Sequence, residues 1–202
     1  CENQLDKSFL DLGEAPPSNA YLKDLKSAKK EKKYPLKLLF CENCYLVQTE
    51  DHNKPEELFT DDYAYFSSTS TSFLRHAKNY TEEIIKKLNL DQRSFVVEIA
   101  SNDGYLLQNF KKNQILVLGI ETTKSTYQKS IDLKIPTINK FFSASFSKKL
   151  LESNKKADLI IANNVYAHVP DINDFTQGLK NLLSKDGTIT IEFPHLLNLL
   201  KF

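Results

Sequence analysis

Three cysteines in the first quarter of the chain have the spacing of a metal site. Cys41 and Cys44 form a Cys-x2-Cys pair, and Cys1 supplies a third thiol. Two thiolates at this spacing can hold a tetrahedral zinc ion from a single turn, and a closed structural site takes four ligands. The fourth would be either a cysteine just before Cys1 or His52. A redox dithiol is the alternative, although no thioredoxin-like strand-to-helix junction is apparent around the pair.

A small-residue loop in the middle of the chain has the position of a nucleotide site. The apolar run 95–100 is typical of a buried parallel strand, and it breaks into residues 100–104 (Ala-Ser-Asn-Asp-Gly), here named the glycine-poor loop. Strand, tight turn and helix is how open α/β sheets present such a site. A pyrophosphate needs several glycines for close backbone approach. One glycine suits a less demanding ligand, an adenosine with an amino-acid tail, and Asn102 tolerates the left-handed backbone region.

Side chains at neighbouring strand ends could complete this site. Glu121 ends the second expected strand, where a carboxylate can accept hydrogen bonds from ribose hydroxyls; the alternative is a solvated strand end. Glu98 is either a buried carboxylate in a hydrogen-bonded network or a direct ligand contact. Phe141 and Phe142 follow the third strand, where one could stack on adenine or both could pack in the core.

A polar segment, residues 163–171 (Asn-Asn-Val-Tyr-Ala-His-Val-Pro-Asp), follows the fourth expected strand and is here named the Asn/His loop. Such side chains at the carboxyl end of a strand face the ligand crevice of an α/β sheet. Pro170 disfavours a helix start before Asp171, so we expect an extended loop. The cofactor-binding candidates are Glu98, Ala100, Asn102, Gly104, Tyr105, Leu106, Glu121, Phe142, Asn163 and Asn164.

Strands and helices are expected to alternate from Ser94 onward. The expected strands are 95–100, 115–121, 136–138, 157–163 and 188–193. The expected helices are 104–112, 124–133, 143–153 and 172–183, with an amphipathic helix at 73–88 and a turn at 185–187. This alternation predicts an α/β fold with a doubly wound, Rossmann-like parallel sheet.

Three regions are expected along the chain. Residues 1–60 hold all three cysteines and can bury little apolar surface, so this small domain needs a zinc staple. Residues 61–93 form a helical connector that begins with an aromatic and hydroxyl-rich stretch, the Tyr/Ser connector (residues 62–72). Residues 94–202 form the sheet domain.

The composition excludes several classes of partner. With 27 basic and 26 acidic residues the net charge is +1, which gives no general attraction to nucleic acid or to acidic membranes. No apolar run is long enough for a membrane span, and no signal peptide is visible. The chain has no methionine, opens on Cys1 and stops within an apolar run, so we expect a piece of a longer protein; a lipidated Cys1 is the alternative.

Several motifs in order resemble one known family, the bacterial S-adenosylmethionine-dependent C-methyltransferases of nucleotide-linked deoxy-keto sugars. The resemblance runs the whole length of the chain. Its motifs are residues 10–13 with 16–20 and 34–36, the Cys41/Cys44 pair with 46–48, and residues 62–68, 97–104, 163–171 and 192–195. The family has a zinc-binding N-terminal domain, a Rossmann-like methyltransferase core and a C-terminal domain. Cys1 aligns with the second cysteine of a first Cys-x2-Cys, which implies a further cysteine just upstream.

The resemblance also implies the site residues and the cofactors. The cofactors are S-adenosylmethionine and zinc, with Cys1, Cys41 and Cys44 as zinc ligands. Tyr63 and His168 match the active-site Tyr and His of the family and would align the substrate and handle the enolate or its proton. The substrate-binding candidates are Tyr65, Ser67, Ser68, Tyr166 and His195. The family continues past Phe202 into a His-Glu-His segment with a catalytic base and into the C-terminal domain, so this core is expected to be incomplete.

The expected reaction is methylation of a carbon beside a ketone. Loss of a proton gives an enolate, which attacks the methyl group in line, and this requires a base, a stabiliser for the enolate oxygen and alignment. The alternatives are an O- or N-methyltransferase on the same scaffold, a non-catalytic zinc-stapled nucleotide-binding module, or a nicotinamide-dependent oxidoreductase. We expect a cytoplasmic protein, a nucleotide-sugar substrate and, in preference to an oligomer, a monomer.

Overall fold

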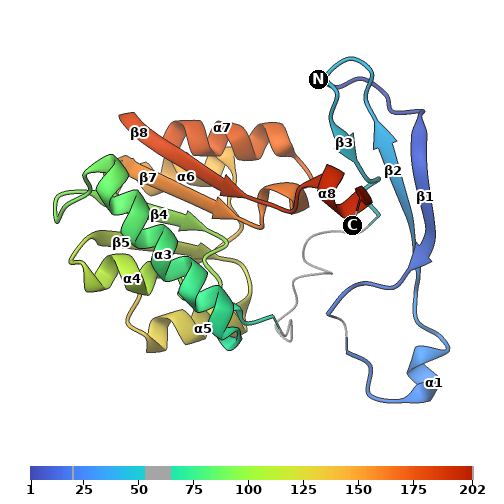
Figure 1. Cartoon of the computed structure of the whole chain (residues 1–202), viewed down its shortest axis with the longest axis horizontal. Helices are drawn as coiled ribbons and strands as arrows, with labels where there is room; N and C mark the ends of the chain where they lie inside the picture. Colours follow the sequence, from blue (N-terminus) through green and yellow to red (C-terminus); the bar gives the residue numbers. More distant parts are fainter. Residues whose placement is uncertain (20, 53–64, 202) are drawn as a thin grey trace. The chain divides into compact units, whose positions relative to one another are not determined.

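The computed structural model describes residues 1–19, 21–52 and 65–201 of the chain. The chain divides into two compact units, Cys1–Ala64 and Tyr65–Phe202, and each is described by itself below (Figure 1). Among the described residues, no helix is both long enough and apolar enough to cross a membrane.

The first unit is a small antiparallel sheet. Strand β1 (Ser8–Ala15) pairs with β2 (Tyr34–Phe40), which pairs with β3 (Val47–Gln48), and the short helix α1 (Leu25–Ala28) lies between β1 and β2 in the chain. Within the described part of this unit only Leu39 and Cys41 are buried. So little buried apolar surface stabilises a fold weakly, and a metal staple would supply what the core lacks.

The second unit is built on a five-stranded parallel sheet with the order β6-β5-β4-β7-β8. Its strands are β4 (Phe95–Ile99), β5 (Leu116–Glu121), β6 (Thr137–Asn139), β7 (Ala157–Asn163) and β8 (Leu183–Glu192). All five residues of β4 are buried, as expected for the central strand of a parallel sheet. The α/β, Rossmann-like class predicted from the sequence is confirmed.

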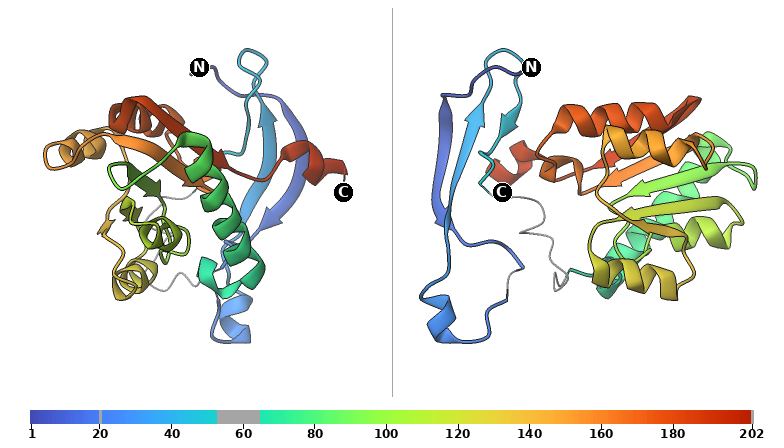
Figure 2. Two further views of the ribbon diagram at one scale, coloured as in Figure 1. Left: turned by 60° about the vertical axis from the view of Figure 1, so that its left-hand side comes forward. Right: turned by 180° about the vertical axis from the view of Figure 1, so that it is seen from behind.

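Helices cover both faces of this sheet (Figure 2). On one face, α3 (Thr71–Leu88) and α4 (Leu107–Lys112) pack on alternate residues of the strands, and α5 (Lys124–Asp132) follows β5. On the other face, α6 (Ala144–Leu151) and α7 (Ile172–Leu182) pack on the remaining residues. Two short 3-10 turns, η1 (Ser67–Thr69) and η2 (Tyr166–His168), and the terminal helix α8 (Leu196–Lys201) complete the unit.

The strand order places a topological switch point between β4 and β7. From β4 the chain winds outward to β5 and β6, and it then crosses back to β7 and β8 on the other side. In an open parallel sheet, ligands bind outside the carboxyl ends of the strands where the winding direction reverses. The glycine-poor loop follows β4 and the Asn/His loop follows β7, so both lie at this point.

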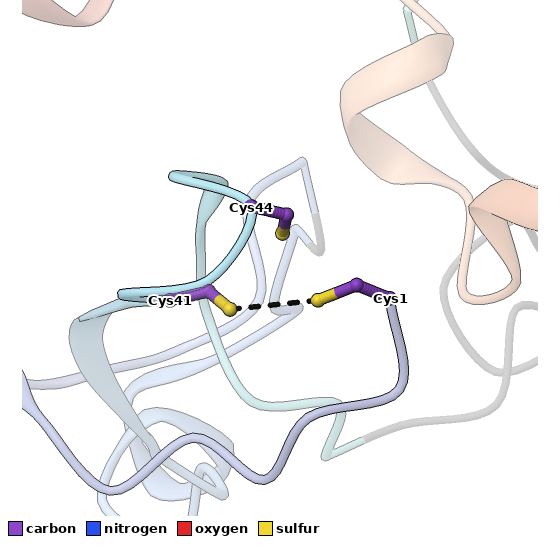
Figure 3. A group of neighbouring side chains, drawn as sticks. All are labelled: Cys1, Cys41 and Cys44. Atoms are coloured by element: carbon purple, nitrogen blue, oxygen red, sulfur yellow. Dashed lines mark hydrogen bonds between the residues drawn. The ribbon is translucent and has the colours of Figure 1, made fainter.

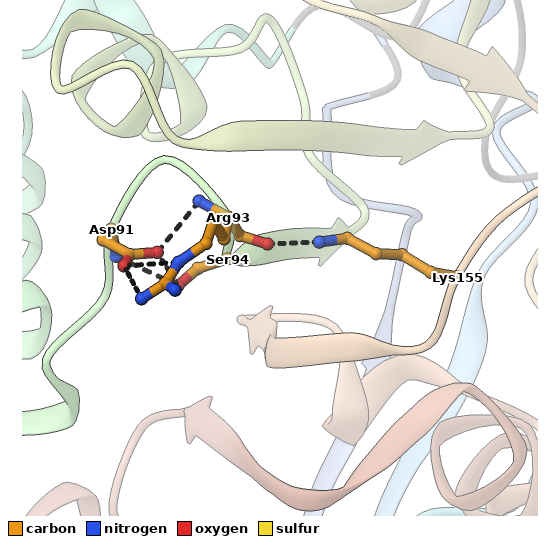
Figure 4. A network of polar contacts seen from close by, with 4 residues as sticks. All are labelled: Asp91, Arg93, Ser94 and Lys155. Atoms are coloured by element: carbon orange, nitrogen blue, oxygen red, sulfur yellow. Dashed lines mark hydrogen bonds and ion pairs between the residues drawn. The ribbon is translucent and has the colours of Figure 1, made fainter.

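The entry into β4 is fixed by a tight polar turn (Figure 4). The Asp91 carboxylate accepts a 2.9 Å hydrogen bond from the backbone N–H of Arg93 and pairs at 2.7 Å with its guanidinium. Lys155 donates to the carbonyl oxygen of Arg93 from the loop before β7. The N–H of Phe95 then donates to Asp158 at 2.8 Å, so the starts of β4 and β7 are held together.

Two predicted boundaries are wrong. The helix expected from Gly104 begins at Leu107, because Gly104 has φ +79°, outside the helical region. The turn expected at 185–187 lies within β8, where the register jumps from Ala157 opposite Leu183 to Leu159 opposite Thr188. The residues between these two pairs form a bulge in β8, so the residues predicted to form a turn lie within the strand.

Candidate functional site

The three cysteines of the first unit converge on one point (Figure 3). The Sγ atoms of Cys1, Cys41 and Cys44 all lie within 4.8 Å of one another, and those of Cys1 and Cys41 are 3.5 Å apart. All three are free thiols. Hydrogen bonds from the backbone N–H groups of Cys44 and Asn43 hold the pKa of the Cys41 thiol below its ordinary value, which favours the thiolate that binds metal.

This geometry fits zinc. Thiolates about 2.3 Å from a tetrahedral ion lie about 3.8 Å from each other, close to the spacing found here. Among the described residues no other Cys, His, Asp or Glu joins the cluster. His52, the alternative fourth ligand, instead stacks on Tyr34 at 6.3 Å and lies 3.6 Å from Glu50. A fourth ligand just before Cys1 remains a prediction.

The glycine-poor loop has a strained backbone. Ala100, Asn102 and Gly104 have φ of +57°, +50° and +79°. Asn102 and Gly104 adopt this region with little cost, whereas Ala100 stores strain there. A Cβ atom on Gly104 would lie 3.0 Å from the Ile135 side chain, so both conformation and space require glycine.

The glycine that permits close approach lies outside the loop, on β5. A Cβ atom on Gly119 would lie 2.4 Å from Oγ of Ser101 and 3.0 Å from Oγ1 of Thr137. The loop therefore folds back over β5, with the N–H of Ser101 donating to the carbonyl oxygen of Ile120 at 3.1 Å. The sequence analysis missed Gly119, although an isolated glycine within a strand is a signal of close backbone approach.

Glu121 ends β5 with both carboxylate oxygens on backbone amides. Oε2 accepts from the N–H of Asn102 at 2.7 Å, and Oε1 accepts from the N–H of Thr123 at 2.8 Å. The residue is 4% exposed, and burial raises the pKa of its carboxyl despite these hydrogen bonds. The alternative of a solvated strand end is thereby excluded. The side chains of Thr126 and Thr123 also hydrogen-bond this carboxyl, so most of its acceptor sites are used within the protein and a ribose contact stays a prediction.

Three buried polar side chains beside Glu121 have oxygens with no hydrogen-bond partner: Oε2 of Glu98, Oγ of Ser101 and Oδ1 of Asp103. Burial, followed by repulsion from Glu121 and Asp103, raises the pKa of Glu98 well above its ordinary value. Oε2 of Glu98 therefore takes no part in a hydrogen-bonded network, which was one of the two alternatives for this residue. Unpartnered buried acceptors are costly, and they mark a place where a donor or a cation would be stabilised.

The described part of the Tyr/Ser connector is bonded directly to the glycine-poor loop. Asn102 accepts from the N–H of Ser67 at 2.9 Å and donates to the carbonyl oxygen of Tyr65 at 3.0 Å. The N–H of Ser68 donates to Asp103 at 3.1 Å. Ser67 is buried, whereas Tyr65 is 49% exposed. Tyr63, the predicted catalytic tyrosine, lies outside the described residues.

The Asn/His loop is less extended than predicted. Asn164 has φ +53°, and Tyr166–His168 form a 3-10 turn in which the N–H of His168 donates to the carbonyl oxygen of Val165 at 2.8 Å. After β7 ends at Asn163, the extended residues are Val169, directly before Pro170, and Asp171, and proline restricts the residue preceding it. The structure leaves the His168 side chain exposed, whereas the Tyr166 hydroxyl is bonded at 2.7 Å to Thr176 of α7.

The remaining candidates divide between core and surface. Tyr105 and Leu106 are buried, with the Tyr105 ring stacked 5.0 Å from Phe73. They lie around a narrow gap that has no room for a water molecule, together with His76, Ala77, Tyr80 and Asn163. The Phe142 ring packs edge-on against Phe175 at 5.2 Å, as in the core alternative, so its contact with a cofactor stays a prediction. His195 is exposed.

The sequence reasoning missed four polar residues near this edge of the sheet. Ser101 and Asp103 had no assigned role although they lie within the loop, because composition does not show which loop side chains turn inward. His76 of α3 and Glu192 at the end of β8 lie 116 positions apart and are hydrogen-bonded at 2.7 Å. The sequence shows that His76 and Glu192 are polar, but it contains no signal that pairs them.

Comparison with known families divides the chain in the same way. Residues 1–59 match a family described as a zinc binding domain, and residues 73–199, more than half of the chain, match a family described as a methyltransferase domain. The C-methyltransferase NovU of Streptomyces niveus is 28% identical over 190 residues, which cover 94% of this chain and 45% of NovU. The chain therefore spans about half the length of this relative.

Solved structures support the fold. The PH0226 protein of Pyrococcus horikoshii OT3 superposes with a TM-score of 0.55 at 16% identity, over 67% of this chain and 61% of that protein. The plantazolicin methyltransferase BpumL, solved with S-adenosylhomocysteine (SAH), has a TM-score of 0.47 at 18% identity, over 60% and 46% of the two chains. At these identities the likeness concerns the fold alone, and a score as low as that of BpumL carries no argument.

Proposed function

This chain belongs to the methyltransferase-domain family, whose cofactor is S-adenosylmethionine (SAM), and we propose that it methylates a carbon beside the ketone of a nucleotide-linked deoxy-keto sugar. The printed activity of NovU, a C-methyltransferase, supports transfer to carbon. We also propose that the protein acts as a cytoplasmic monomer whose partner is the nucleotide-sugar, without nucleic acid or membrane.

The buried acidic side chains of Glu98 and Asp103, in and after β4, suit the positive charges of this cofactor. SAM carries a sulfonium and an ammonium group, and when bound it supplies an electrophilic methyl group. Glu98 and Asp103 each have a buried oxygen without a hydrogen-bond partner. Burial, followed by repulsion from Glu121 and Asp103, raises the pKa of Glu98, and a cation in this neighbourhood would stabilise its ionised carboxylate. A dinucleotide would instead bring a pyrophosphate toward acidic side chains and a loop with one glycine.

The observation that carries the proposal is the bonding of the Tyr/Ser connector to the glycine-poor loop through Asn102. One side chain holds the carbonyl oxygen of Tyr65 and the N–H of Ser67, so an acceptor bound by the connector would be aligned with the cofactor. In our proposal Tyr65, Ser67, Ser68, Tyr166 and His195 contact the nucleotide-sugar.

In the proposed mechanism, removal of the proton beside the ketone gives an enolate. The enolate carbon would form the new bond to the methyl group as the sulfur–methyl bond of the bound cofactor breaks, with SAH as the leaving group. Tyr63 and His168 align the sugar and stabilise the enolate oxygen or carry its proton. His168 is exposed on a 3-10 turn at the carboxyl end of β7, where it is accessible to a substrate. A base in a His-Glu-His segment beyond Phe202 would complete the site.

The experiment replaces His168 by Asn in the full-length protein and measures methyl transfer to a panel of nucleotide-linked deoxy-keto sugars, together with SAH affinity. Loss of a proton-handling group costs about 100-fold or more in turnover, while SAH affinity stays within about twofold. Asn173→Ala, at an exposed position on the first turn of α7, is the control and leaves both values unchanged. Normal turnover by His168→Asn would refute the assignment.

A further inference from the structure

Glu192 at the end of β8 joins three elements of the second unit. Its Oε2 is bonded at 2.7 Å to Nε2 of His76 on α3, and its Oε1 accepts from Nδ2 of Asn164 at 3.2 Å. Its carbonyl oxygen also accepts from the N–H of Asn164 at 2.6 Å. The side chain and the backbone of Glu192 are therefore both hydrogen-bonded to Asn164, which lies at the start of the Asn/His loop and has a left-handed backbone with φ +53°.

The far end of the Asn/His loop is anchored separately. The Asp171 carboxylate caps α7 by accepting from the N–H groups of Asn173 and Asp174 at 3.0 and 2.9 Å. The loop is thus clamped at Asp171 by the cap and at Asn164 by Glu192. Between the clamps lie Tyr166 and His168, so a shift of either end moves the side chains proposed to contact the acceptor.

Global stability does not account for the His76–Glu192 pair. The side chains are 53% and 37% exposed, and ion pairs so accessible to solvent contribute little to folding. The packing of α3 is supplied elsewhere, by the buried residues Ala77, Thr81 and Ile84 and by Tyr80, whose hydroxyl is bonded at 2.5 Å to Thr190. The pair instead affects the position of the loop, because His76 is bonded to the Glu192 carboxylate, which also holds Asn164 at the start of the Asn/His loop.

His76 also lies beside the cofactor end of the sheet. It lies around the same narrow gap as Tyr105, Leu106 and Asn163, three of the candidates for cofactor binding. We propose that His76 is a positioning residue, which orients Glu192 and through it sets the conformation of the Asn/His loop. The expected effect of His76 on turnover rests on the proposed function, whereas its expected effect on the loop conformation does not.

The test uses the full-length protein with His76→Ala, His76→Gln and, as the control, Arg75→Ala at the neighbouring exposed position of α3. Hydrogen exchange of residues 164–169 is measured by mass spectrometry, with SAH affinity by calorimetry. In His76→Ala the loop amides exchange about tenfold faster, since their local opening becomes easier, while the core strands are unchanged. His76→Gln keeps a donor and restores much of the protection; Arg75→Ala has no effect.

Turnover provides a second readout on the same variants. Misplacement of a loop that aligns reactants can cost up to about 100-fold in kcat, so His76→Ala is expected to lower kcat with SAH affinity within about twofold. Combining His76→Ala with Glu192→Ala should add almost nothing to Glu192→Ala alone, because His76 acts on the loop through the Glu192 carboxylate. Strict additivity, or unchanged loop exchange in His76→Ala, would overturn the inference. Absence of sugar methylation by the unmodified protein would refute the proposed function and leave the exchange result standing.

Discussion

The backbone N–H of Asn102 donates a 2.7 Å hydrogen bond to Oε2 of Glu121, which ties the glycine-poor loop to the end of β5. The carboxylate predicted to bind ribose is therefore also the group that holds the loop in its strained conformation. Asn102 in turn holds the Tyr/Ser connector through its side chain. Loop, strand end and connector form one bonded unit, and a change at Glu121 should affect all three.

Replacement of Glu121 by Ala is expected to weaken SAH binding at least about tenfold, because it removes the expected ribose acceptor and frees the loop. The N–H groups of Asn102 and Thr123 lose their acceptor, which costs about 1–3 kcal/mol of stability for each group that stays buried. Calorimetry with SAH and urea unfolding measure the two effects. Glu152→Ala, at an exposed position after α6, is the control, and unchanged SAH affinity in Glu121→Ala would contradict the assignment.

A methyl group at Gly119 of β5 should displace the glycine-poor loop, which packs directly against this residue. The added Cβ would lie 2.4 Å from Oγ of Ser101, so Gly119→Ala displaces Ser101 and is expected to cost about 1–3 kcal/mol of stability, with weaker SAH binding. Combining it with Ser101→Gly removes the clash and should recover part of both losses. A double variant no better than Gly119→Ala alone would show that the close approach is unimportant.

The cysteine cluster should carry zinc. We expect about one zinc per chain in the purified full-length protein, with Cys41→Ser losing most of it, because serine provides no thiolate for the site. Metal content is measured by mass spectrometry after dialysis. His52→Ala is the matched control, since His52 lies outside the cluster, and it should retain the metal. Zinc loss in His52→Ala but not in Cys41→Ser would reverse the ligand assignment.

Glu98 should make the protein less stable as the pH rises. Burial, with repulsion from Glu121 and Asp103, raises its pKa well above the ordinary value of 4.5. Between 4.5 and the folded-state pKa, the folded protein binds more protons at Glu98 than the unfolded chain, so this residue's contribution to the free energy of unfolding falls with pH. Glu98→Gln removes the titration.

The difference between Glu98→Gln and the parent should therefore be small at about pH 5 and should grow in favour of the variant toward about pH 8. Between the unfolded and folded pKa of Glu98, the gain is at most about 1.4 kcal/mol for each pH unit. Urea unfolding of both proteins across this range measures it. A difference independent of pH would mean that Glu98 is not held protonated by its surroundings.

The sequence predicted the fold class because alternating strands and helices leave a strong periodic signal. The sequence also marked Asn102 as a residue that tolerates the left-handed region, which it adopts with φ +50°. It missed the start of α4 and the bulge in β8, because both depend on how a turn packs against another strand. The roles of Gly119, Asp103 and the His76–Glu192 pair depend on contacts between segments far apart in the chain, which no local pattern contains.

Transfer of the methyl group to carbon is the central claim, and proton exchange tests it most directly. The full-length protein is incubated with SAH and a nucleotide-linked deoxy-keto sugar in deuterated water, and the sugar is followed by proton NMR. Because SAH has no methyl group to transfer, the reaction stops at the enolate, and the enolate takes up deuterium from the solvent. We predict loss of the signal of the proton beside the ketone, at a rate that falls in His168→Asn. A protein that methylates oxygen or nitrogen of its acceptor with SAM, while that signal persists with SAH, would contradict the account.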